Sequence, residues 1–248
     1  KIIMRSLAGS DKKMTMELGG KAANIIFDDA PLDQAVEGIV NGIFFNQGHV
    51  CCAGSRLLVQ EGIAEKVLAK LKIRIRTLRV GDPLDPHSEM GPVNSARQHA
   101  RVLELIDSAR REGARLVTGG GRPPGAAFEK GYWVQPTLFA DVTPTMRLAR
   151  EEVFGPVVCA LKFRDEAEAV ALANDSELGL TAAVWTRELP LAMRMIRQIE
   201  AGTVWINTAG QHFVGTPFGG WKDSGLGGEE CLEELLSYSR LKAVHVLS

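Results

Sequence analysis

One stretch of the sequence decides how the rest of the chain is understood: Phe44-Phe45-Asn46-Gln47-Gly48-His49-Val50-Cys51-Cys52-Ala53-Gly54-Ser55-Arg56. Before it, apolar residues recur every three or four positions, which predicts an amphipathic helix that ends near Gly48. These apolar residues are Leu32, Ala35, Val36, Ile39, Val40 and Ile43. After it, the apolar run at 56–60 predicts a strand. Two adjacent thiols therefore lie in a turn of small residues between a helix and a strand.

The same alternation of helix and strand runs through the whole chain. Further strands are expected at 22–27, 115–118, 132–138, 157–163, 180–185, 203–206 and 241–247. Further helices are expected at 63–78, 95–112, 165–174, 189–199 and after the glycine-rich segment 210–228. Asp28 and Asp29, which precede Pro31, are expected to cap the helix that follows, and Asp165 is expected to cap a later one. This order indicates an α/β fold with a mostly parallel sheet flanked by helices.

Composition argues against several classes of function. The 248 residues are 45% hydrophobic and 24% charged, with a formal net charge of -1, as in ordinary globular proteins. We expect no nucleic-acid partner, because no basic cluster is interleaved with aromatics, and no membrane span, because no apolar run reaches about 18 residues. Cys51, Cys52, Cys159 and Cys231 follow neither a disulfide framework nor zinc-ligand spacing. We therefore expect reduced thiols, no metal and a cytoplasmic location.

Cys51 is a candidate nucleophile. The thiolate is the reactive form of cysteine, and the backbone N–H groups of a tight turn can stabilise both a thiolate and the oxyanion that forms after its attack on a carbonyl. Two other interpretations stay open. The cysteines could simply pack in the core, as free cysteines usually do. Cys51 could instead form a dyad with His49, although residues two apart beside a helix end seldom face each other.

Two further units carry carboxylates. Glu17 precedes Gly19-Gly20, where the lack of side chains allows a tight turn and the close approach of a ligand, so Glu17 could deprotonate a water molecule. Glu152 and Phe154 precede a Gly-Pro turn; the carboxylate could accept both hydroxyls of a ribose, and the aromatic ring could cover a flat ligand. Alternatively, both acids are solvated and the phenylalanine belongs to the core. The sequence contains no GxGxxG or Walker loop.

In this order the units resemble the aldehyde dehydrogenase superfamily over essentially the whole chain. The matching pieces are Glu17-Leu18-Gly19-Gly20-Lys21, Phe45-Asn46-Gln47-Gly48 with Cys51, Glu152-Val153-Phe154-Gly155-Pro156, Asn207, Pro217-Phe218-Gly219-Gly220, Lys222 and Ser224-Gly225. The resemblance implies the fold of the aldehyde dehydrogenase catalytic domain, a small-molecule aldehyde as substrate, and NAD or NADP as cofactor. It also identifies Cys51 rather than Cys52 as the nucleophile and weakens the case for a dyad with His49.

The resemblance implies a covalent mechanism. Cys51 would attack the aldehyde carbon to give a thiohemiacetal, whose oxyanion would be held partly by the Cys51 backbone N–H. Loss of a hydride to nicotinamide would leave a thioester on Cys51. Glu17 would then activate the water that releases the carboxylic acid.

The same resemblance implies the binding residues. Glu152 would bind the nicotinamide ribose, Phe154 would pack beside it, and Leu18 would contact the ring through its backbone. Asn207 would support the Glu17 region. The wall of the substrate tunnel would include Gln211, His212, Phe213 and Phe218.

The resemblance also implies how the chain is organised. Residues 1–20 would be the remnant of a largely missing cofactor-binding domain, 21–220 the catalytic domain, and 221–248 a return segment with an oligomerisation strand. That strand, from Leu241 to Leu247, would extend the sheet of a neighbouring subunit in a homo-oligomer. Because positioning the cofactor against the substrate is the main catalytic device, hydride transfer by this chain alone is expected to be absent or very weak.

Two other functions compete with aldehyde oxidation. A cysteine and a glutamate without a hydride acceptor could still hydrolyse activated esters through the same thioester, which would make the chain a thiol esterase. The fold could also serve as a non-catalytic oligomerisation module.

Overall fold

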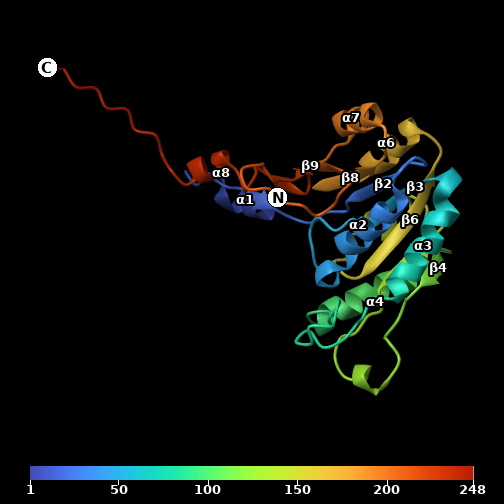
Figure 1. Cartoon of the computed structure of the whole chain (residues 1–248). Helices are drawn as coiled ribbons and strands as arrows, with labels where there is room; N and C mark the ends of the chain where they lie inside the picture. The colour runs from blue at the N-terminus through green and yellow to red at the C-terminus, as the bar shows by residue number, and fades with distance from the viewer. Residues whose placement is uncertain (248) are drawn as a thin grey trace.

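The computed structural model describes residues 1–247, so that Ser248, the last residue of the predicted return segment, lies outside the described part. A seven-stranded sheet forms the centre of the molecule, in the order β4-β5-β6-β3-β2-β8-β9 (Figure 1). In chain order, its strands are β2 (Ala23–Ile26), β3 (Arg56–Gln60), β4 (Arg115–Thr118), β5 (Thr137–Ala140), β6 (Val157–Phe163), β8 (Thr181–Trp185) and β9 (Thr203–Ile206). Neighbouring strands are parallel except β4 and β5, which are antiparallel. The predicted α/β fold with a mostly parallel sheet is confirmed.

Helices cover both faces of this sheet. They are α2 (Leu32–Phe44), α3 (Ala64–Arg76), α4 (Ala96–Arg111), α5 (Arg147–Arg150), α6 (Glu166–Asn174) and α7 (Leu189–Gln198), with short 3-10 turns at Phe45–Gly48, Glu61–Ile63 and Ala126–Phe128. Successive residues of a strand point to opposite faces. Accordingly, Ile25 packs with the α4, α5, α6 and α7 side chains in one core, and Ile26 packs with the α2 and α3 side chains in the other.

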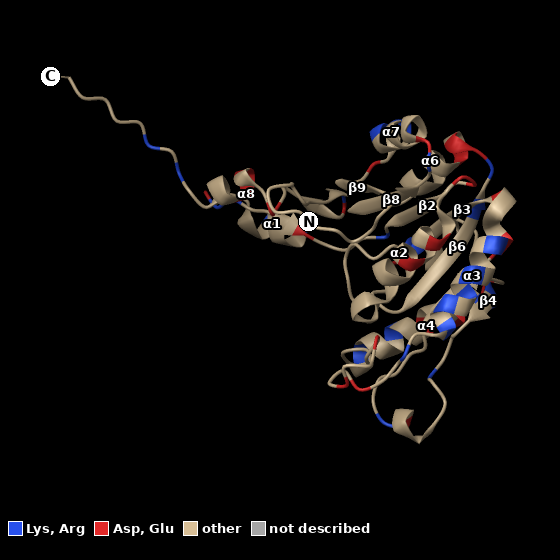
Figure 2. Ribbon diagram, in the orientation of Figure 1, with Lys and Arg blue, Asp and Glu red and all other residues tan. Residues whose placement is uncertain are grey.

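The outer faces of the helices are charged, and α3 in particular is basic (Figure 2). Lys70 pairs with Asp33 at 2.6 Å and Arg74 with Glu37 at 2.9 Å, which ties α3 to α2 across the surface. Exposed pairs of this kind contribute about 0–1 kcal/mol each, so the buried apolar faces hold the helices in place.

One predicted helix cap is wrong. The N-cap of α2 is Pro31, and no side chain caps it. Asp29 instead accepts hydrogen bonds from the Thr186 hydroxyl at 2.8 Å and from the backbone N–H groups of Arg187 and Glu188 at 2.7 and 3.1 Å. These groups stand at the start of α7, where the helix dipole favours a negative charge. The tertiary contact therefore outweighs the local one.

Of two further predictions, the helix cap at Asp165 is confirmed and the strand at 132–138 is only partly correct. Asp165 caps α6 as predicted, accepting from the Glu168 N–H at 3.0 Å. The strand predicted at 132–138 is wrong in its first half, because β5 starts only at Thr137. Residues 132–136 form isolated contacts with loops, such as the bond from the Gln135 N–H to the Gly121 carbonyl at 2.8 Å, and have no neighbouring strand in the described residues.

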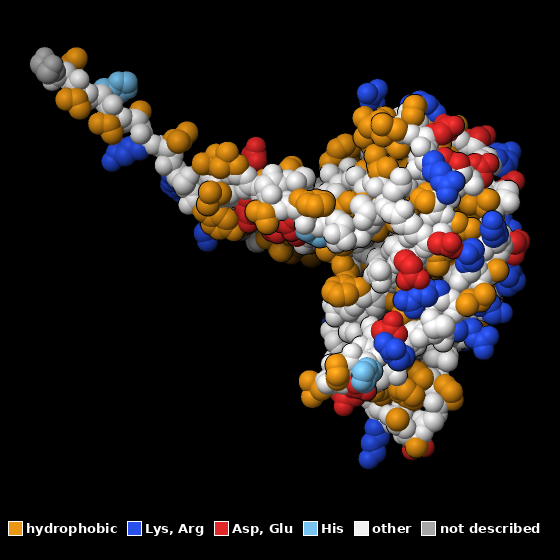
Figure 3. Space-filling view, viewed as in Figure 1, with side chains coloured by type: hydrophobic (Ala, Val, Ile, Leu, Met, Phe, Trp, Pro, Cys, Tyr) orange, Lys and Arg blue, Asp and Glu red, His pale blue; other side chains and the backbone are white. Residues whose placement is uncertain are grey.

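The two ends of the chain form a projecting arm beside the sheet (Figure 1). It contains α1 (Ile2–Leu7), α8 (Leu232–Ser237) and the antiparallel pair of β1 (Met16–Glu17) with β11 (Gly225–Leu226). A second antiparallel pair, β7 (Leu178–Gly179) with β10 (Trp221–Lys222), joins the C-terminal segment to the chain just before β8. Figure 3 shows hydrophobic side chains along this arm and its tail. None of the helices in residues 1–247 is long and apolar enough to cross a membrane.

The strand predicted from Leu241 to Leu247 is not a strand in this chain. Residues 241–247 have no assigned secondary structure and run away from the body of the protein (Figure 1). A strand needs a partner for its backbone N–H and C=O groups, and no described segment of the chain provides one. The apolar side chains of Leu241, Val244, Val246 and Leu247 are exposed.

Candidate functional site

Three loops that carry the predicted site residues meet at one edge of the sheet. The loop with Glu17 leads into β2, the loop with Cys51 into β3, and the loop with Glu152 into β6. These three strands are adjacent and parallel, in the order β6-β3-β2. The loops that precede parallel neighbours begin at the same edge, and for this reason segments over 130 residues apart in the sequence lie together.

Close backbone contacts join the three loops. The Gly20 N–H donates to Glu152 Oε1 at 3.1 Å. A Cβ added to Gly20 would lie 2.4 Å from the carbonyl oxygen of Cys51, and one added to Gly48 would lie 2.2 Å from that of Gly155. Gly48 also has a φ of +72°, which a side chain would strain. The motif glycines are therefore the places where the loops touch.

Ser224 holds the turn that follows Glu17. Its backbone carbonyl accepts from the Leu18 N–H at 3.0 Å, and its hydroxyl donates to the Gly19 carbonyl at 2.7 Å and accepts from the Gly179 N–H at 3.0 Å. The side chain is fully buried. Ser224 was part of the sequence motif, but no role was predicted for it; a small hydroxyl residue between glycines was the only signal.

Glu17 is a carboxylate without a hydrogen-bond partner. Both of its oxygens are buried, and neither bonds to any described residue. Burial first, and then the negative charges of Glu229, Cys51 and Glu230, raises the pKa of Glu17 to about 7. A carboxylate with a pKa near neutrality is well matched to a general base at physiological pH.

Cys51 has the opposite shift. The thiol of Cys52 donates to the Cys51 sulfur and, with the backbone N–H groups of both residues, lowers the pKa of Cys51 to about 6, although burial opposes this. The pKa of Cys52 is raised, first by that same hydrogen bond. Cys51 is half-buried, whereas Cys52 is buried. The pair therefore divides into a thiolate and a thiol that donates to it.

His49 does not approach Cys51 as a base would. Its ring stacks on Phe154, with centroids 5.5 Å apart and an interplanar angle of 8°. Nε2 is buried without a partner in the described residues, and burial lowers the pKa of His49. The alternative of a Cys–His dyad therefore has no contact in its favour.

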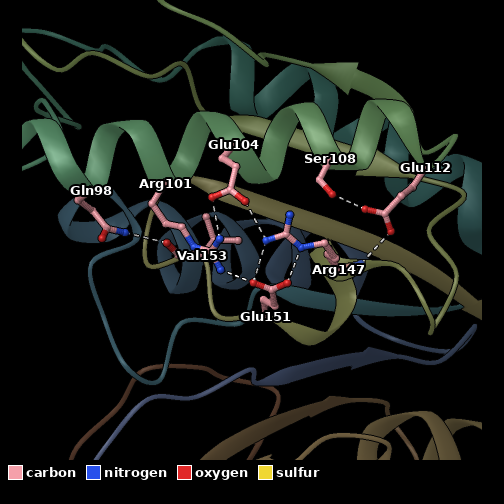
Figure 4. A network of polar contacts seen from close by, with 8 residues as sticks. All are labelled: Gln98, Arg101, Glu104, Ser108, Glu112, Arg147, Glu151 and Val153. Atoms are coloured by element: carbon pink, nitrogen blue, oxygen red, sulfur yellow. Dashed lines mark hydrogen bonds and ion pairs between the residues drawn. The ribbon is translucent and has the colours of Figure 1, made fainter.

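Glu152 and Phe154 lie on a loop that α4 holds from behind. The Gln98 side-chain amide donates to the carbonyl of Val153 at 2.8 Å (Figure 4). It also donates to the carbonyl of Phe154 at 2.9 Å. This bond fixes Phe154 in a left-handed conformation, with a φ of +50°. Burial raises the pKa of Glu152, although the Gly20 N–H and the charge of Lys21 oppose it.

A network of ion pairs anchors the neighbouring Glu151 (Figure 4). Arg147 of α5 donates to Glu151 at 2.6 Å and pairs with Glu104 of α4 at 2.9 Å. Arg101 bridges the same two carboxylates. Because each side chain has more than one partner, this network positions the loop better than an isolated surface pair would. None of its members was predicted from the sequence.

A cavity of about 490 Å³ opens beside Cys52. Its wall includes Phe45, Val50, Cys52, Gln211 and His212. Of the four predicted tunnel residues, Gln211 and His212 line the cavity. Phe213 and Phe218 do not: Phe213 is 64% exposed, and Phe218 packs with Cys52 and Trp205 in a small core.

Asn207, which was predicted to support the Glu17 region, bonds to Thr186. Its side-chain amide donates to the Thr186 carbonyl at 2.9 Å and accepts from the Thr186 N–H at 3.1 Å. These bonds join the ends of β8 and β9, because Asn207 and Thr186 directly follow those two strands. Its side chain makes no hydrogen bond to Glu17.

The model of the aldehyde dehydrogenase family matches residues 1–244. The chain belongs to the aldehyde dehydrogenase family. It is 47% identical to the betaine aldehyde dehydrogenase of Brucella melitensis biotype 2, over 98% of this chain and 50% of that protein. The match to the enzyme of that name from Mesorhizobium japonicum is also 47% identical, over 97% and 50%. The chain thus spans about half the length of the curated relatives it matches.

Solved structures of aldehyde dehydrogenases match the fold. Betaine aldehyde dehydrogenase from Staphylococcus aureus in complex with NAD+ superposes with a TM-score of 0.93 and 41% identity, covering 96% of this chain and 47% of that one. A putative aldehyde dehydrogenase from Burkholderia cenocepacia gives a TM-score of 0.94 and 44% identity, covering 96% and 49%.

In this member of the aldehyde dehydrogenase family, we expect Gly20→Ala to disrupt the site. The added methyl group would collide with the Cys51 carbonyl and crowd Leu180, at a cost of about 1–3 kcal/mol in unfolding free energy. Urea unfolding and the rate of Cys51 alkylation by iodoacetamide measure both effects. Gly62→Ala is the matched control, because nothing lies within 4 Å of its Cβ position. Equal behaviour of the two variants would contradict the close contact.

Proposed function

We propose that this chain carries the cysteine chemistry of an NAD(P)-dependent oxidation of aldehydes to carboxylic acids. The observation that carries the proposal is the convergence of Cys51, with its lowered pKa, and the unpaired Glu17, whose own pKa the charge of Cys51 helps to raise. Membership of the aldehyde dehydrogenase family supports it. The four free cysteines agree with a reducing compartment such as the cytoplasm.

Cys51 and its neighbours perform the first step. The thiolate attacks the aldehyde carbon, and the carbonyl electron pair moves to oxygen. The backbone N–H groups of Cys51 and Cys52, which stabilise the thiolate, are suited to receive the oxyanion as well.

Glu17 performs the last step. When the carbon is at the oxidation level of a thioester, the Glu17 carboxylate takes a proton from water, and the hydroxide attacks the same carbon. The C–S bond breaks, the acid leaves, and Cys51 regains its thiolate. No ordered partner competes for the carboxylate in the described residues.

The residues at the edge of the sheet where the three loops meet fit a nicotinamide nucleotide. The Glu152 carboxylate accepts one N–H bond, from Gly20, which leaves acceptor positions for the two hydroxyls of a ribose. Leu18 and Phe154 are exposed beside it and offer apolar contact to a flat ring. When bound, nicotinamide supplies the acceptor for the hydride. The solved relative that holds NAD+ supports NAD over NADP.

The relatives also guide the choice of substrate. Several of them are named betaine aldehyde dehydrogenases, so betaine aldehyde belongs in the first substrate panel with aliphatic and aromatic aldehydes. Two earlier predictions stay proposals: the division at 1–20, 21–220 and 221–248, and a homo-oligomer through residues 241–247.

The test separates thiol chemistry from oxidation. Without nucleotide, we expect p-nitrophenyl acetate to give a burst of nitrophenol as Cys51 is acylated. NADH or NADPH formation with the aldehyde panel then measures hydride transfer, which is expected to be weak for this chain alone. Ester turnover with no aldehyde adduct at Cys51 by mass spectrometry would favour the thiol esterase. If neither a burst nor an adduct forms, the non-catalytic oligomerisation module is the function that remains.

A further inference from the structure

His212 lies in the wall of the cavity beside Cys52, with the charged residues Arg74 and Glu89, and the proposed mechanism does not use it. It lines the cavity with Phe45, Val50 and Gln211, and its ring lies on Phe218 with centroids 4.6 Å apart. Most of the surrounding wall is apolar, so the imidazole of His212 offers a polar contact to a molecule bound in the cavity.

Glu230 fixes the orientation of this ring. His212 Nδ1 lies 2.9 and 3.1 Å from the two carboxylate oxygens of Glu230. Glu230 is itself held: its carbonyl accepts from the Gly215 N–H at 2.8 Å, and its N–H donates to the Glu234 carboxylate at 2.6 Å. The two side chains therefore form a positioned pair.

The contact determines which nitrogen remains for a ligand. A carboxylate only accepts hydrogen bonds, so Nδ1 carries the hydrogen. Nε2 makes no hydrogen bond to the described residues and is left for an occupant of the cavity. It accepts a hydrogen bond when the ring is neutral and donates one when the ring is charged. A hydroxyl group can meet either state, because it both donates and accepts.

The charges around the pair argue against an anionic occupant. The negative charges of Glu229 and Glu230 both reach Glu17 and contribute to its raised pKa. Arg74, the cation in the cavity wall, is already paired with Glu37 and Glu89. A substrate carboxylate near His212 would therefore meet several like charges, whereas a hydroxyl would not.

We propose that the His212–Glu230 pair is a specificity-determining subsite that selects aldehydes bearing a hydroxyl group over alkyl aldehydes of the same length. This inference rests on the proposed function, in which the aldehyde adds to Cys51. His212 binds the hydroxyl through Nε2, Glu230 positions the ring, and Phe218 supports it from behind.

The test uses the whole chain and needs no cofactor. An aldehyde that adds reversibly to Cys51 protects it from iodoacetamide, and mass spectrometry gives the concentration that halves the alkylation rate. The matched pairs are glycolaldehyde against acetaldehyde and glyceraldehyde against propanal. Comparing each ratio between variants cancels the differences in aldehyde hydration.

In the unmodified chain, the hydroxyaldehydes should protect at lower concentration. His212→Phe, which keeps the ring volume, should reduce that preference by about three- to tenfold, which corresponds to one lost hydrogen bond. Glu230→Gln should reduce it partly, and guards against a folding defect of the first variant. His87→Phe makes the same exchange in an exposed loop and should change nothing.

Each failure has its own meaning. An unchanged ratio in both His212→Phe and Glu230→Gln would overturn the subsite while leaving aldehyde addition at Cys51 intact. Stronger protection by succinic semialdehyde than by the hydroxyaldehydes would show that the subsite prefers an anionic group to a hydroxyl group, which contradicts the proposal. If no aldehyde protects Cys51, the proposed function falls and this inference falls with it.

Discussion

Cys51→Ala is expected to abolish the nitrophenol burst and all covalent adducts with aldehydes. No other group replaces the nucleophile: Cys52 is buried and its pKa is raised, so it stays a thiol. Loss of an essential nucleophile lowers covalent turnover by factors on the order of 10⁴–10⁶. Stopped-flow release of nitrophenol and the intact mass of the acylated chain measure the effect.

Two further cysteine variants make this prediction specific. Cys52→Ala should keep a burst but raise the pKa of Cys51, because the strongest stabilising donor is lost. The midpoint of the pH dependence of iodoacetamide alkylation, expected near 6 in the unmodified chain, should then move upward. Cys231→Ala, at the N-cap of α8, should leave burst and midpoint unchanged. A full burst in Cys51→Ala would show that Cys51 is not the nucleophile.

Much of the fold could be predicted because the strands are short apolar runs. The predicted bounds of β3, β4, β6 and β9 agree with the structure, since a charged residue or a glycine stands directly on one side of each run. The order of the strands and the edge at which the loops meet could not be predicted. Both depend on pairings between segments far apart in the sequence, which local patterns do not encode.

Three features that local patterns did not predict share one physical cause. Asp29 was assigned to the nearest helix but accepts hydrogen bonds from the residues just before α7, over 150 residues away. The run from Leu241 to Leu247 has the alternation of a strand but lacks a partner among the described residues. Asn207 bonds to Thr186, which only the parallel pairing of β8 and β9 brings near. In each case a tertiary neighbour decides the outcome.

The sequence predicted which motif residues meet at the candidate site but not the residues that hold them there. Cys51, Glu17 and Glu152 belong to motifs and lie together. Ser224, which holds the Glu17 turn, and Gln98, which holds the Phe154 loop, act through backbone bonds that leave little trace in a sequence. Their partners are carbonyl groups, which every residue has, so the sequence around the partner carries no pattern to recognise.

Glu17→Gln is expected to slow breakdown of the acyl-enzyme by about 10²–10⁴, the usual contribution of a general base, and to leave acylation nearly unchanged. The amide keeps the shape of the side chain but cannot take a proton from water. Only the carboxylate form is active, so deacylation in the unmodified chain should rise with pH through about 7 and then level off. Pre-steady-state kinetics with p-nitrophenyl acetate separate the two phases across pH, and the inflection should vanish in the variant.

The same substitution should stabilise the fold above neutral pH. The pKa of Glu17 is raised from its ordinary value of 4.5 to about 7, so the folded state binds more protons than the unfolded state between these values. The free energy of unfolding therefore falls as pH rises through this window, and Glu17→Gln removes that loss. Urea unfolding should find the variant more stable than the unmodified chain above pH 7 and equally stable below 4.5. Equal slowing of both kinetic phases, with no gain in stability at high pH, would show that Glu17 is an ordinary structural carboxylate rather than the strained base of deacylation.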